Sequence, residues 1–284
     1  MKVISFCLWG DKPMYNVGAI RNAQLIPQIY PDWQGWFYVS NSVPEETIEE
    51  LKSFDHVKVI SAGDESNWSS MLWRTLPVSI DTDVEIMVSR DTDCRLNLRE
   101  KKAVDEWLDS GEPFHLMRDH PYHTVPIMGG MWGCRVSPTL EILSDRTNLD
   151  VKSLFAYFQT WQDIQIKFAT GQIPKTEGYA DVAIEELLGI SKGSGIDQTF
   201  YRHIYEAMGK NIFSHDSFPH YNPFSGHHET NANPLRIPCV GFPDRLKTPS
   251  DFVGQDWDEN DVPTPTSYQA ILHARGKIKE GKLM

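Results

Sequence analysis

The chain has 284 residues, of which 40% are hydrophobic and 23% charged, and its formal net charge is −12. This composition is typical of a globular protein with one large α/β domain or two small ones. No apolar run approaches the ~18 residues of a membrane span, and the acidity argues against a nucleic-acid-binding surface. The four cysteines (Cys7, Cys94, Cys134 and Cys239) form no CxxC pair, so we expect no zinc site and a cytoplasmic location.

Strand-like and helix-like segments alternate through the first 120 residues. Their apolar patterns predict strands at 2–9, 36–39, 57–60, 84–88 and 114–117, and helices at 14–30, 43–54, 69–76 and 98–108. This alternation predicts βαβ units and therefore an α/β domain, Rossmann-like, with a mostly parallel central sheet flanked by helices. The first loop has no G-x-G-x-x-G pattern and no Walker sequence is present, which disfavours a dinucleotide site.

The second half of the chain is less regular. Residues 149–189 have a helical pattern with a polar interruption, 197–208 form an amphipathic helix, and 211–213 precede a polar turn. The chain from 219 onward is rich in Pro, Gly, His and Asn, which predicts an irregular segment wrapped over the domain. For the basic end, residues 275–282, a solvated tail is favoured over a peripheral membrane contact.

Two aspartates leave the fourth predicted strand one residue apart. Asp91 and Asp93 follow the apolar run 84–88 and are flanked by Arg90 and Arg95. Ligands in α/β proteins bind at the carboxyl ends of the strands. Two carboxylates at i and i+2 can bind one hard cation there, although Asp-Thr-Asp is also an ordinary turn sequence.

Two further motifs follow. The fifth predicted strand ends in Arg118, Asp119 and His120, and the glycine-rich stretch 127–135 contains Gly129, Gly130 and Trp132. Glycines let a backbone approach a ligand closely, although a glycine-rich hairpin packed under a tryptophan would have the same sequence. Two strands that deliver Arg-Asp to one sheet edge, if adjacent, would form a dense polar site.

The order of these motifs resembles the GT-A fold of glycosyltransferases, in particular small bacterial and viral members with Arg-Asp-x-Asp, Arg-Asp-His-Pro and Gly-Gly-x-Trp-Gly. The resemblance covers roughly residues 1–255 and is strongest over 89–135. It implies a catalytic domain at 1–255, in which 159–193 is a possible acceptor-specific insertion, and a C-terminal tail at 256–284.

The resemblance also implies a metal site. Asp91 and Asp93 would hold Mn²⁺ or Mg²⁺ against the diphosphate of a nucleotide-sugar donor, since carboxylates suit such hard ions. A histidine near the end of the core often completes the metal shell in this fold. His215 is the best match for it, and His227 and His228 are its competitors.

By the same resemblance, the donor would be a UDP- or GDP-linked hexose or deoxyhexose and the acceptor a glycan, as in polysaccharide biosynthesis. Three arginines are candidates to pair with phosphate: Arg21, Arg90 and Arg118. The base of the nucleotide would lie at the end of the first strand. The residues of the second and third motifs would line the sugar pocket. The predicted donor-binding residues are Trp9, Gly10, Asp11, Arg90, Asp91, Arg118, His120, Gly129, Gly130 and Trp132.

The catalytic base is expected among two aspartates. Asp197, which opens the 197–208 helix, resembles an acidic element at the acceptor side of this fold and would by that resemblance act as base or as a sugar-hydroxyl ligand, although an N-cap is a sufficient structural reason for it. Asp119 is the second candidate, and the sequence does not choose between inverting and retaining transfer.

Three other functions share parts of this pattern. A sugar-phosphate nucleotidyltransferase would also place carboxylates at strand ends, but the loop at Gly10 is a poor match for its basic glycine-rich loop. A metal-dependent phosphohydrolase could use His120, His123 and His215, but Pro121 disfavours a helical ligand pair. A non-catalytic sugar-binding module would not need paired aspartates beside arginines.

Overall fold

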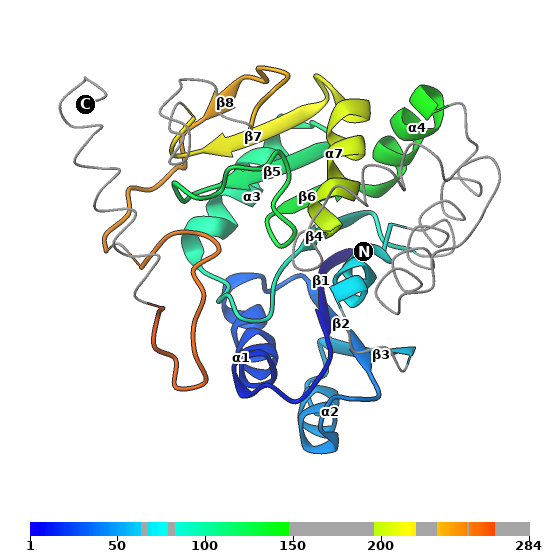
Figure 1. Cartoon of the computed structure of the whole chain (residues 1–284), viewed down its shortest axis with the longest axis vertical. Helices are drawn as coiled ribbons and strands as arrows, with labels where there is room; N and C mark the ends of the chain where they lie inside the picture. Colours follow the sequence, from blue (N-terminus) through cyan, green and yellow to red (C-terminus); the bar gives the residue numbers. More distant parts are fainter. Residues whose placement is uncertain (64–67, 79–82, 148–195, 220–231, 249, 265–284) are drawn as a thin grey trace.

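The computed structural model describes residues 1–63, 68–78, 83–147, 196–219, 232–248 and 250–264 (Figure 1). These residues form an eight-stranded sheet in the order β3-β2-β1-β4-β6-β5-β7-β8. Its strands are β1 (Lys2–Leu8), β2 (Gln34–Ser40), β3 (Val57–Gly63), β4 (Ile86–Ser89), β5 (Phe114–Arg118), β6 (Trp132–Arg135), β7 (Ile212–Asp216) and β8 (Cys239–Val240). The helices are α1 (Pro13–Ile29), α2 (Glu45–Lys52), the 3₁₀ helix η1 (Trp68–Thr75), α3 (Leu98–Ser110), α4 (Val136–Thr147) and α7 (Ile196–Met208).

All strands run parallel except β6, which pairs antiparallel with both β4 and β5. The predicted fold class, an α/β domain with a mostly parallel sheet, is therefore confirmed. The expectation that β4 and β5 could be neighbours is wrong, because β6 lies between them. The register pairs Ser89 with Trp132, so the start of β6 lies at the carboxyl end of β4. The glycine-rich segment before β6 is thereby brought to the Asp91 turn.

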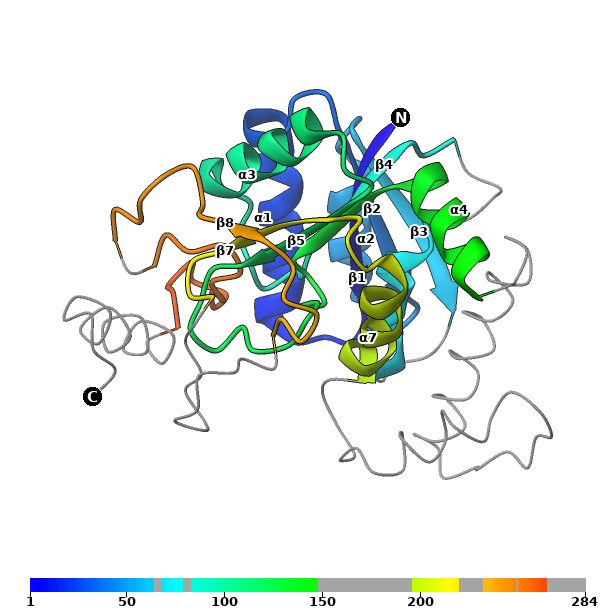
Figure 2. The same cartoon turned by 90° about the horizontal axis from the view of Figure 1, so that it is seen from above.

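The sheet has a hydrophobic core on each face, and Figure 2 shows helices on both of its sides. Along β1, Ile4, Phe6 and Leu8 join the core under α1, α2 and α3, whereas Val3 and Cys7 join the core on the side of η1, α4 and α7. This follows from the alternation of side chains along a strand. Both faces are covered, which explains why the parallel strands are continuous apolar runs.

The helix boundaries follow local signals in the sequence. The side chain of Asn97 accepts a hydrogen bond from the backbone N–H of Glu100 (2.9 Å) and so caps the start of α3. Gly111 follows α3 with a φ of 78°, which is the usual glycine stop. The predicted helix at 69–76 is the 3₁₀ helix η1, whereas α4 and β6 have no counterpart among the predicted elements. The patterns at 149–189 and 275–282 lie outside the described residues.

Residues 250–264, here called the strap, close the described part of the chain. The backbone N–H of Trp257 donates to the carbonyl oxygen of Asp93 (2.9 Å), and Arg95 and Arg21 both pair with Asp261 (3.0 and 2.8 Å). Figure 1 shows this dark orange segment passing the end of α3 and then running down past α1. The strap is irregular and wraps over the domain, and it crosses the tail boundary expected at 255. In the described part of the chain, no helix has the length and apolarity needed to cross a membrane.

Candidate functional site

Asp91 and Asp93 lie in the turn that follows β4, at the carboxyl edge of the parallel strands. Asp91 is 39% exposed and forms an ion pair with Arg74 of η1, whose side chain is only 2% exposed. Asp93 is also partly buried. One carboxylate of the pair is thus partly balanced by a buried cation.

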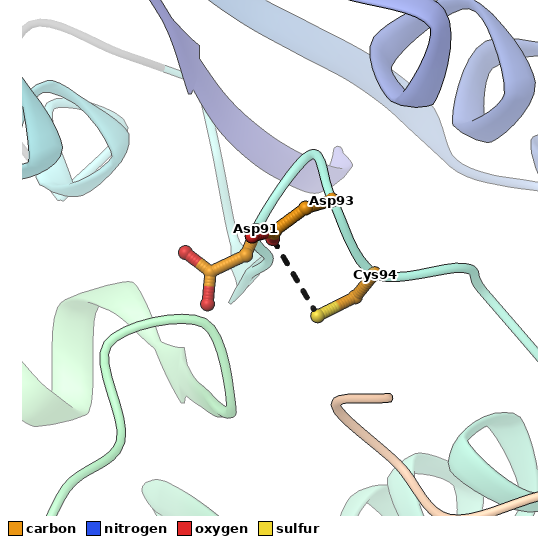
Figure 3. Close-up of side chains that lie close together, drawn as sticks. All are labelled: Asp91, Asp93 and Cys94. Carbon is orange, nitrogen blue, oxygen red and sulfur yellow. Dashed lines mark hydrogen bonds between the residues drawn. The ribbon is translucent and has the colours of Figure 1, made fainter. Parts of the chain in front are cut away.

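A third residue joins this pair. Ligand atoms of Asp91, Asp93 and Cys94 all lie within 4.8 Å of one another, and Figure 3 shows the Cys94 thiol facing Asp93. The thiol lies 3.8 Å from Asp93 Oδ1 and 3.9 Å from Asp256 Oδ1. Asp256 belongs to the strap, which forms a β-bridge with the turn at Cys94. The strap therefore brings another carboxylate to the turn.

Burial and mutual repulsion change the acidities of this cluster. Burial, with the charges of Asp91 and Asp256, raises the pKa of Asp93 to about 8. Burial and Asp91 raise the pKa of Asp256 to about 6. The pKa of the Cys94 thiol is raised well above its usual range, first by burial and then by the carboxylates. The cluster thus carries negative charge that Arg74 compensates only in part.

Helix α1 fixes the shape of the turn. The side chain of Asn22 is 1% exposed, donates to the carbonyl oxygens of Thr92 (3.3 Å) and Cys94 (2.8 Å), and accepts from the N–H of Leu96 (3.1 Å). Gly18 lies one helical turn earlier, where a Cβ atom would overlap the carbonyl oxygen of Thr92. The helix backbone therefore packs directly on the turn, and an asparagine satisfies its polar groups.

The glycine-rich segment covers the turn from the other side. Ser89 Oγ donates to the carbonyl oxygen of Gly129 (2.8 Å). A Cβ atom on Gly130 would overlap the carboxylate and the backbone nitrogen of Asp91, so only glycine fits at this position. Gly130 thus borders Asp91, whereas the sequence pattern predicted only that the backbone of Gly129 and Gly130 would approach a ligand closely.

The oxygen ligands of this cluster suit a hard divalent cation. Two carboxylates one residue apart, with a third on the strap, are the ligands that Mg²⁺ and Mn²⁺ prefer. Cys94 is less suitable, because its raised pKa keeps it a neutral thiol. A bound cation would also offset the repulsion that raises the pKa of Asp93.

The three arginines predicted to bind phosphate are neutralised within the protein. Arg90 pairs with Glu100 (2.7 Å), Arg118 with Asp216 (2.8 Å) and Arg21 with Asp261 (2.8 Å). The side chains of Arg90 and Arg118 are at most 3% exposed. This geometry gives Arg90 and Arg118 a structural role in place of the expected phosphate contact.

Asp119 and His120 are also buried. Arg99 donates to both carboxylate oxygens of Asp119 (2.6 and 2.7 Å), which also accepts from Ser217 Oγ and from the N–H of Val253 (2.9 Å). Asp119 is 0% exposed, and both of its carboxylate oxygens already accept hydrogen bonds. It therefore cannot accept a proton from a group on the solvent side. The geometry does not support a catalytic base at this position. His120 is 5% exposed and packs on Phe252.

His215 is not part of the acidic cluster. It lies in β7 with 0% exposure, and its Nδ1 and Nε2 atoms contact His115 Nε2 (2.9 Å) and Glu106 Oε2 (3.0 Å). Both ring nitrogens thus have protein partners, so the geometry does not support His215 as the metal ligand. The two competing histidines, His227 and His228, lie outside the described residues.

The remaining predicted donor residues fall into two groups. Gly10 and Asp11 follow the carboxyl end of β1, where the N–H of Gly10 donates to Ser42 Oγ (2.9 Å) and Asp11 is exposed. Trp9 packs against the core, and Trp132 is 2% exposed and stacks on Phe114 with 5.3 Å between ring centroids. Trp132 is therefore a core residue and does not line a donor pocket.

The predicted base Asp197 lies in the first turn of α7, and its side chain is not among the described ones. Two site residues were missed in the sequence. Arg74 comes from a segment with no motif, and its contact with Asp91 spans 17 positions. Asp256 opens an acidic run that the sequence pattern assigns to an irregular segment wrapped over the domain. No local signal in the sequence places either of them beside the turn.

Comparisons with known proteins give matches only among solved structures. No family profile matches the chain, and no curated protein sequence does. The chain is similar to a mannosyltransferase from Pyrobaculum calidifontis in complex with GDP-Man and Mn²⁺, with 11% identity and a TM-score of 0.36 over 51% of this chain and 46% of that one. It is also similar to a glycosyltransferase involved in glycosylation of the major capsid of the virus PBCV-1, with 13% identity and a TM-score of 0.41 over 76% and 82% of the two chains.

A third similar structure is mannosyl-3-phosphoglycerate synthase from Rubrobacter xylanophilus, with 12% identity and a TM-score of 0.37 over 62% of this chain and 77% of that one. The chain spans about half the length of the first structures that it matches, 46% and 58%. At TM-scores below 0.5, these similarities carry no argument about family, substrates or catalytic residues.

Proposed function

We propose that the chain is a metal-dependent glycosyltransferase that moves a sugar from a nucleotide-diphosphate donor to a hydroxyl group of a glycan or other acceptor. The observation that carries this proposal is the cluster of Asp91, Asp93 and Asp256 at the carboxyl edge of the sheet. There burial and repulsion raise the pKa of Asp93 to about 8. The motifs in the sequence supply the reaction class by resemblance.

Asp91 and Asp93 would hold the cation, and Asp256 would contribute a carboxylate from the strap. A bound Mn²⁺ or Mg²⁺ ion supplies stabilisation of the charge that develops on the departing nucleoside diphosphate. Arg74 holds Asp91 in place by its ion pair, and the close approach of Gly130 leaves backbone beside the carboxylate. Gly10 and Asp11, at the neighbouring strand end, would border the nucleotide.

The donor is proposed to be a UDP- or GDP-linked hexose or deoxyhexose, and Asp197 remains the proposed base. The first test measures Mn²⁺-dependent hydrolysis and thermal stabilisation with UDP-, GDP-, CMP- and dTDP-sugars. We expect at least one donor to stabilise the protein when Mn²⁺ is present. The proposal fails if none of them binds, with or without the metal.

The Asp93→Asn variant tests the metal site. Loss of one carboxylate ligand is expected to lower metal-dependent turnover by on the order of 100-fold or more, because charge on the leaving group is no longer balanced. The melting temperature is expected to hold or rise, since the variant removes a buried repulsion. Asp109→Asn is the matched control: Asp109 is exposed near the end of α3, and full activity is expected there. Native turnover in Asp93→Asn would place the metal elsewhere.

Asp256→Asn tests the contribution of the strap. If this carboxylate belongs to the metal shell, Mn²⁺ affinity measured by calorimetry should fall by about tenfold, the loss expected when a supporting group is removed from a metal site. Backbone pairing of the strap with Cys94 does not depend on the carboxylate, so the fold should persist. Equal Mn²⁺ affinities in the native protein and this variant would exclude Asp256 from the site.

The nucleotidyltransferase alternative predicts a different product. Such an enzyme would release pyrophosphate from a nucleoside triphosphate and a sugar 1-phosphate. A glycosyltransferase releases a nucleoside diphosphate from the nucleotide sugar. Measuring both products with the same preparation therefore separates the two functions.

A further inference from the structure

A cavity of about 290 Å³ lies between the start of α3 and the strap. Its thirteen lining residues include five that are basic, Arg95, Arg99, Lys102, Arg245 and Lys247, and two that are acidic, Asp244 and Asp251. The chain as a whole has a net charge of −12. A positive excess in one cavity of such an acidic protein favours an anionic ligand.

Three of the five cations form ion pairs within the protein, and Lys247 acts on Asp244 only at longer range, where its charge helps to lower the pKa of that carboxyl. Arg99 binds Asp119, Arg95 pairs with Asp261, and Lys102 pairs with Asp244 (2.7 Å). By contrast, Arg245 and Lys247 are exposed and have no ion-pair partner within 4 Å among the described residues. They are therefore available to a ligand. The first turn of α3 also lines the cavity, so the positive end of the helix dipole lies against it.

The other wall of the cavity suits a sugar ring. Phe252 and Trp257 line it, together with Gln255. Gln255 is 2% exposed, and its Oε1 atom has no hydrogen-bond partner in the described part of the structure. An indole such as that of Trp257 offers an apolar surface to a pyranose.

From these features, we infer that this cavity binds an anionic sugar, with a phosphate or carboxylate group on Arg245 and Lys247 and the ring beside Trp257. The cavity has about the size of a small-ligand site. Along the strap, Gln255 and Trp257 line the cavity, whereas Asp256 between them faces Asp93 and Cys94. The site is thus separate from the metal cluster, although the strap contributes residues to both.

The test is titration calorimetry in EDTA with four probes: glucose 6-phosphate, glucuronate, inorganic phosphate and glucose. We expect glucose 6-phosphate or glucuronate to bind, and the difference between their affinities identifies the preferred anionic group. Inorganic phosphate should bind more weakly, and glucose should not bind. Affinity should fall as salt is raised. Because no metal is present, the result does not depend on the proposed transferase activity. Failure of both anionic sugars to bind would overturn the inference.

The variant Arg245→Gln/Lys247→Gln removes the two available cations. We expect its dissociation constant for the anionic sugar to rise by on the order of tenfold, from the loss of two partly exposed charge pairs. Lys52→Gln/Lys210→Gln is the matched control, because it changes the net charge by the same amount at exposed positions elsewhere. Equal weakening in both double variants would show a non-specific charge effect and contradict the site.

The Asp93→Asn variant locates the binding. It alters the metal cluster and leaves the lining of the cavity unchanged, so anionic-sugar affinity should stay within about twofold of the native value. A large loss of affinity in this variant would place the sugar at the metal cluster and overturn the inference. If the transferase assays fail while this binding persists, the second site stands without the proposed function.

Discussion

At the scale of single residues, the turn that carries Asp91 and Asp93 depends on the absence of a side chain at Gly130 as well as on the side chains around it. Gly130 lies where any side chain would overlap the Asp91 carboxylate. Its role is visible only when β6 is known to pair antiparallel with β4, which places the segment before β6 at the turn. The glycine pattern in the sequence indicated a close approach of backbone but not its partner.

Gly130→Ala is therefore expected to displace Asp91 and disrupt its ion pair with Arg74. Mn²⁺ affinity should fall by about tenfold or more, with a loss of stability of about 1–3 kcal/mol from the steric overlap. Calorimetry with Mn²⁺ and chemical denaturation measure the two effects. Gly241→Ala is the control, since a Cβ atom there meets nothing within 4 Å. Similar Mn²⁺ affinities in both variants would mean that Asp91 tolerates the shift.

The arginines show why single residues are hard to assign from sequence. Arg90 and Arg118 belong to the Arg-Asp motifs. Each nevertheless forms an ion pair with a buried carboxylate more distant in the chain, Arg90 with Glu100 and Arg118 with Asp216. Arg74, outside every motif, reaches Asp91. Charge pairing inside a protein is decided by tertiary neighbours. A motif therefore predicts which residue types lie at a strand end, but it does not predict which residues form ion pairs with them.

At the scale of elements, the turn is held by α1 and closed by the strap. The pattern of the sequence predicted α1 and the strands around it, because their apolar residues repeat with the period of a helix or form continuous buried runs. It did not predict that Asn22, in the middle of this helix, would bind three backbone groups of a turn about 70 positions later. Such polar contacts between distant elements produce no periodic pattern in the sequence.

Asn22→Ala is expected to lower the free energy of unfolding by about 3 kcal/mol, because three hydrogen bonds are lost and buried backbone groups are left without partners. Metal-dependent activity should fall further than stability alone explains, since the turn carries Asp91 and Asp93. Urea denaturation and turnover at saturating Mn²⁺ are the measurements. Gln28→Ala, at an exposed position of the same helix, should change stability by less than about 0.5 kcal/mol. A loss that small in Asn22→Ala would contradict the role of α1.

At the scale of the whole molecule, the fold class followed from the sequence and the strand order did not. Continuous apolar strands between amphipathic helices specify a parallel sheet that is covered on both faces. The insertion of β6 between β4 and β5 depends on four residues, Trp132–Arg135, at the end of a glycine-rich stretch that favours a loop. The same insertion buries Trp132 against Phe114, which removes it from the predicted donor pocket.

Two histidines, one in β5 and one in the loop that follows it, also oppose folding when they are charged. His115 contacts His215 and stacks on Trp107 (5.1 Å between centroids), and burial, followed by the charges of His215 and Arg90, lowers its pKa well below 6.5. Burial also lowers the pKa of His123 well below 6.5. These imidazoles stay neutral in the folded protein and take up protons in the unfolded chain. The unfolded state thus binds more protons below about pH 6.5, and stability falls as the pH is lowered through that value.

His115→Gln should reduce this acid sensitivity. A glutamine keeps a polar group near His215 but does not titrate, so one fewer proton is taken up on unfolding below pH 6.5. The slope of unfolding free energy against pH between 5 and 6 should decrease by up to about 1.4 kcal/mol per pH unit relative to the native protein. Urea denaturation at each pH in the presence of EDTA measures this slope. A native slope in the variant would show that His115 is already protonated in the folded protein and that the acid sensitivity arises elsewhere.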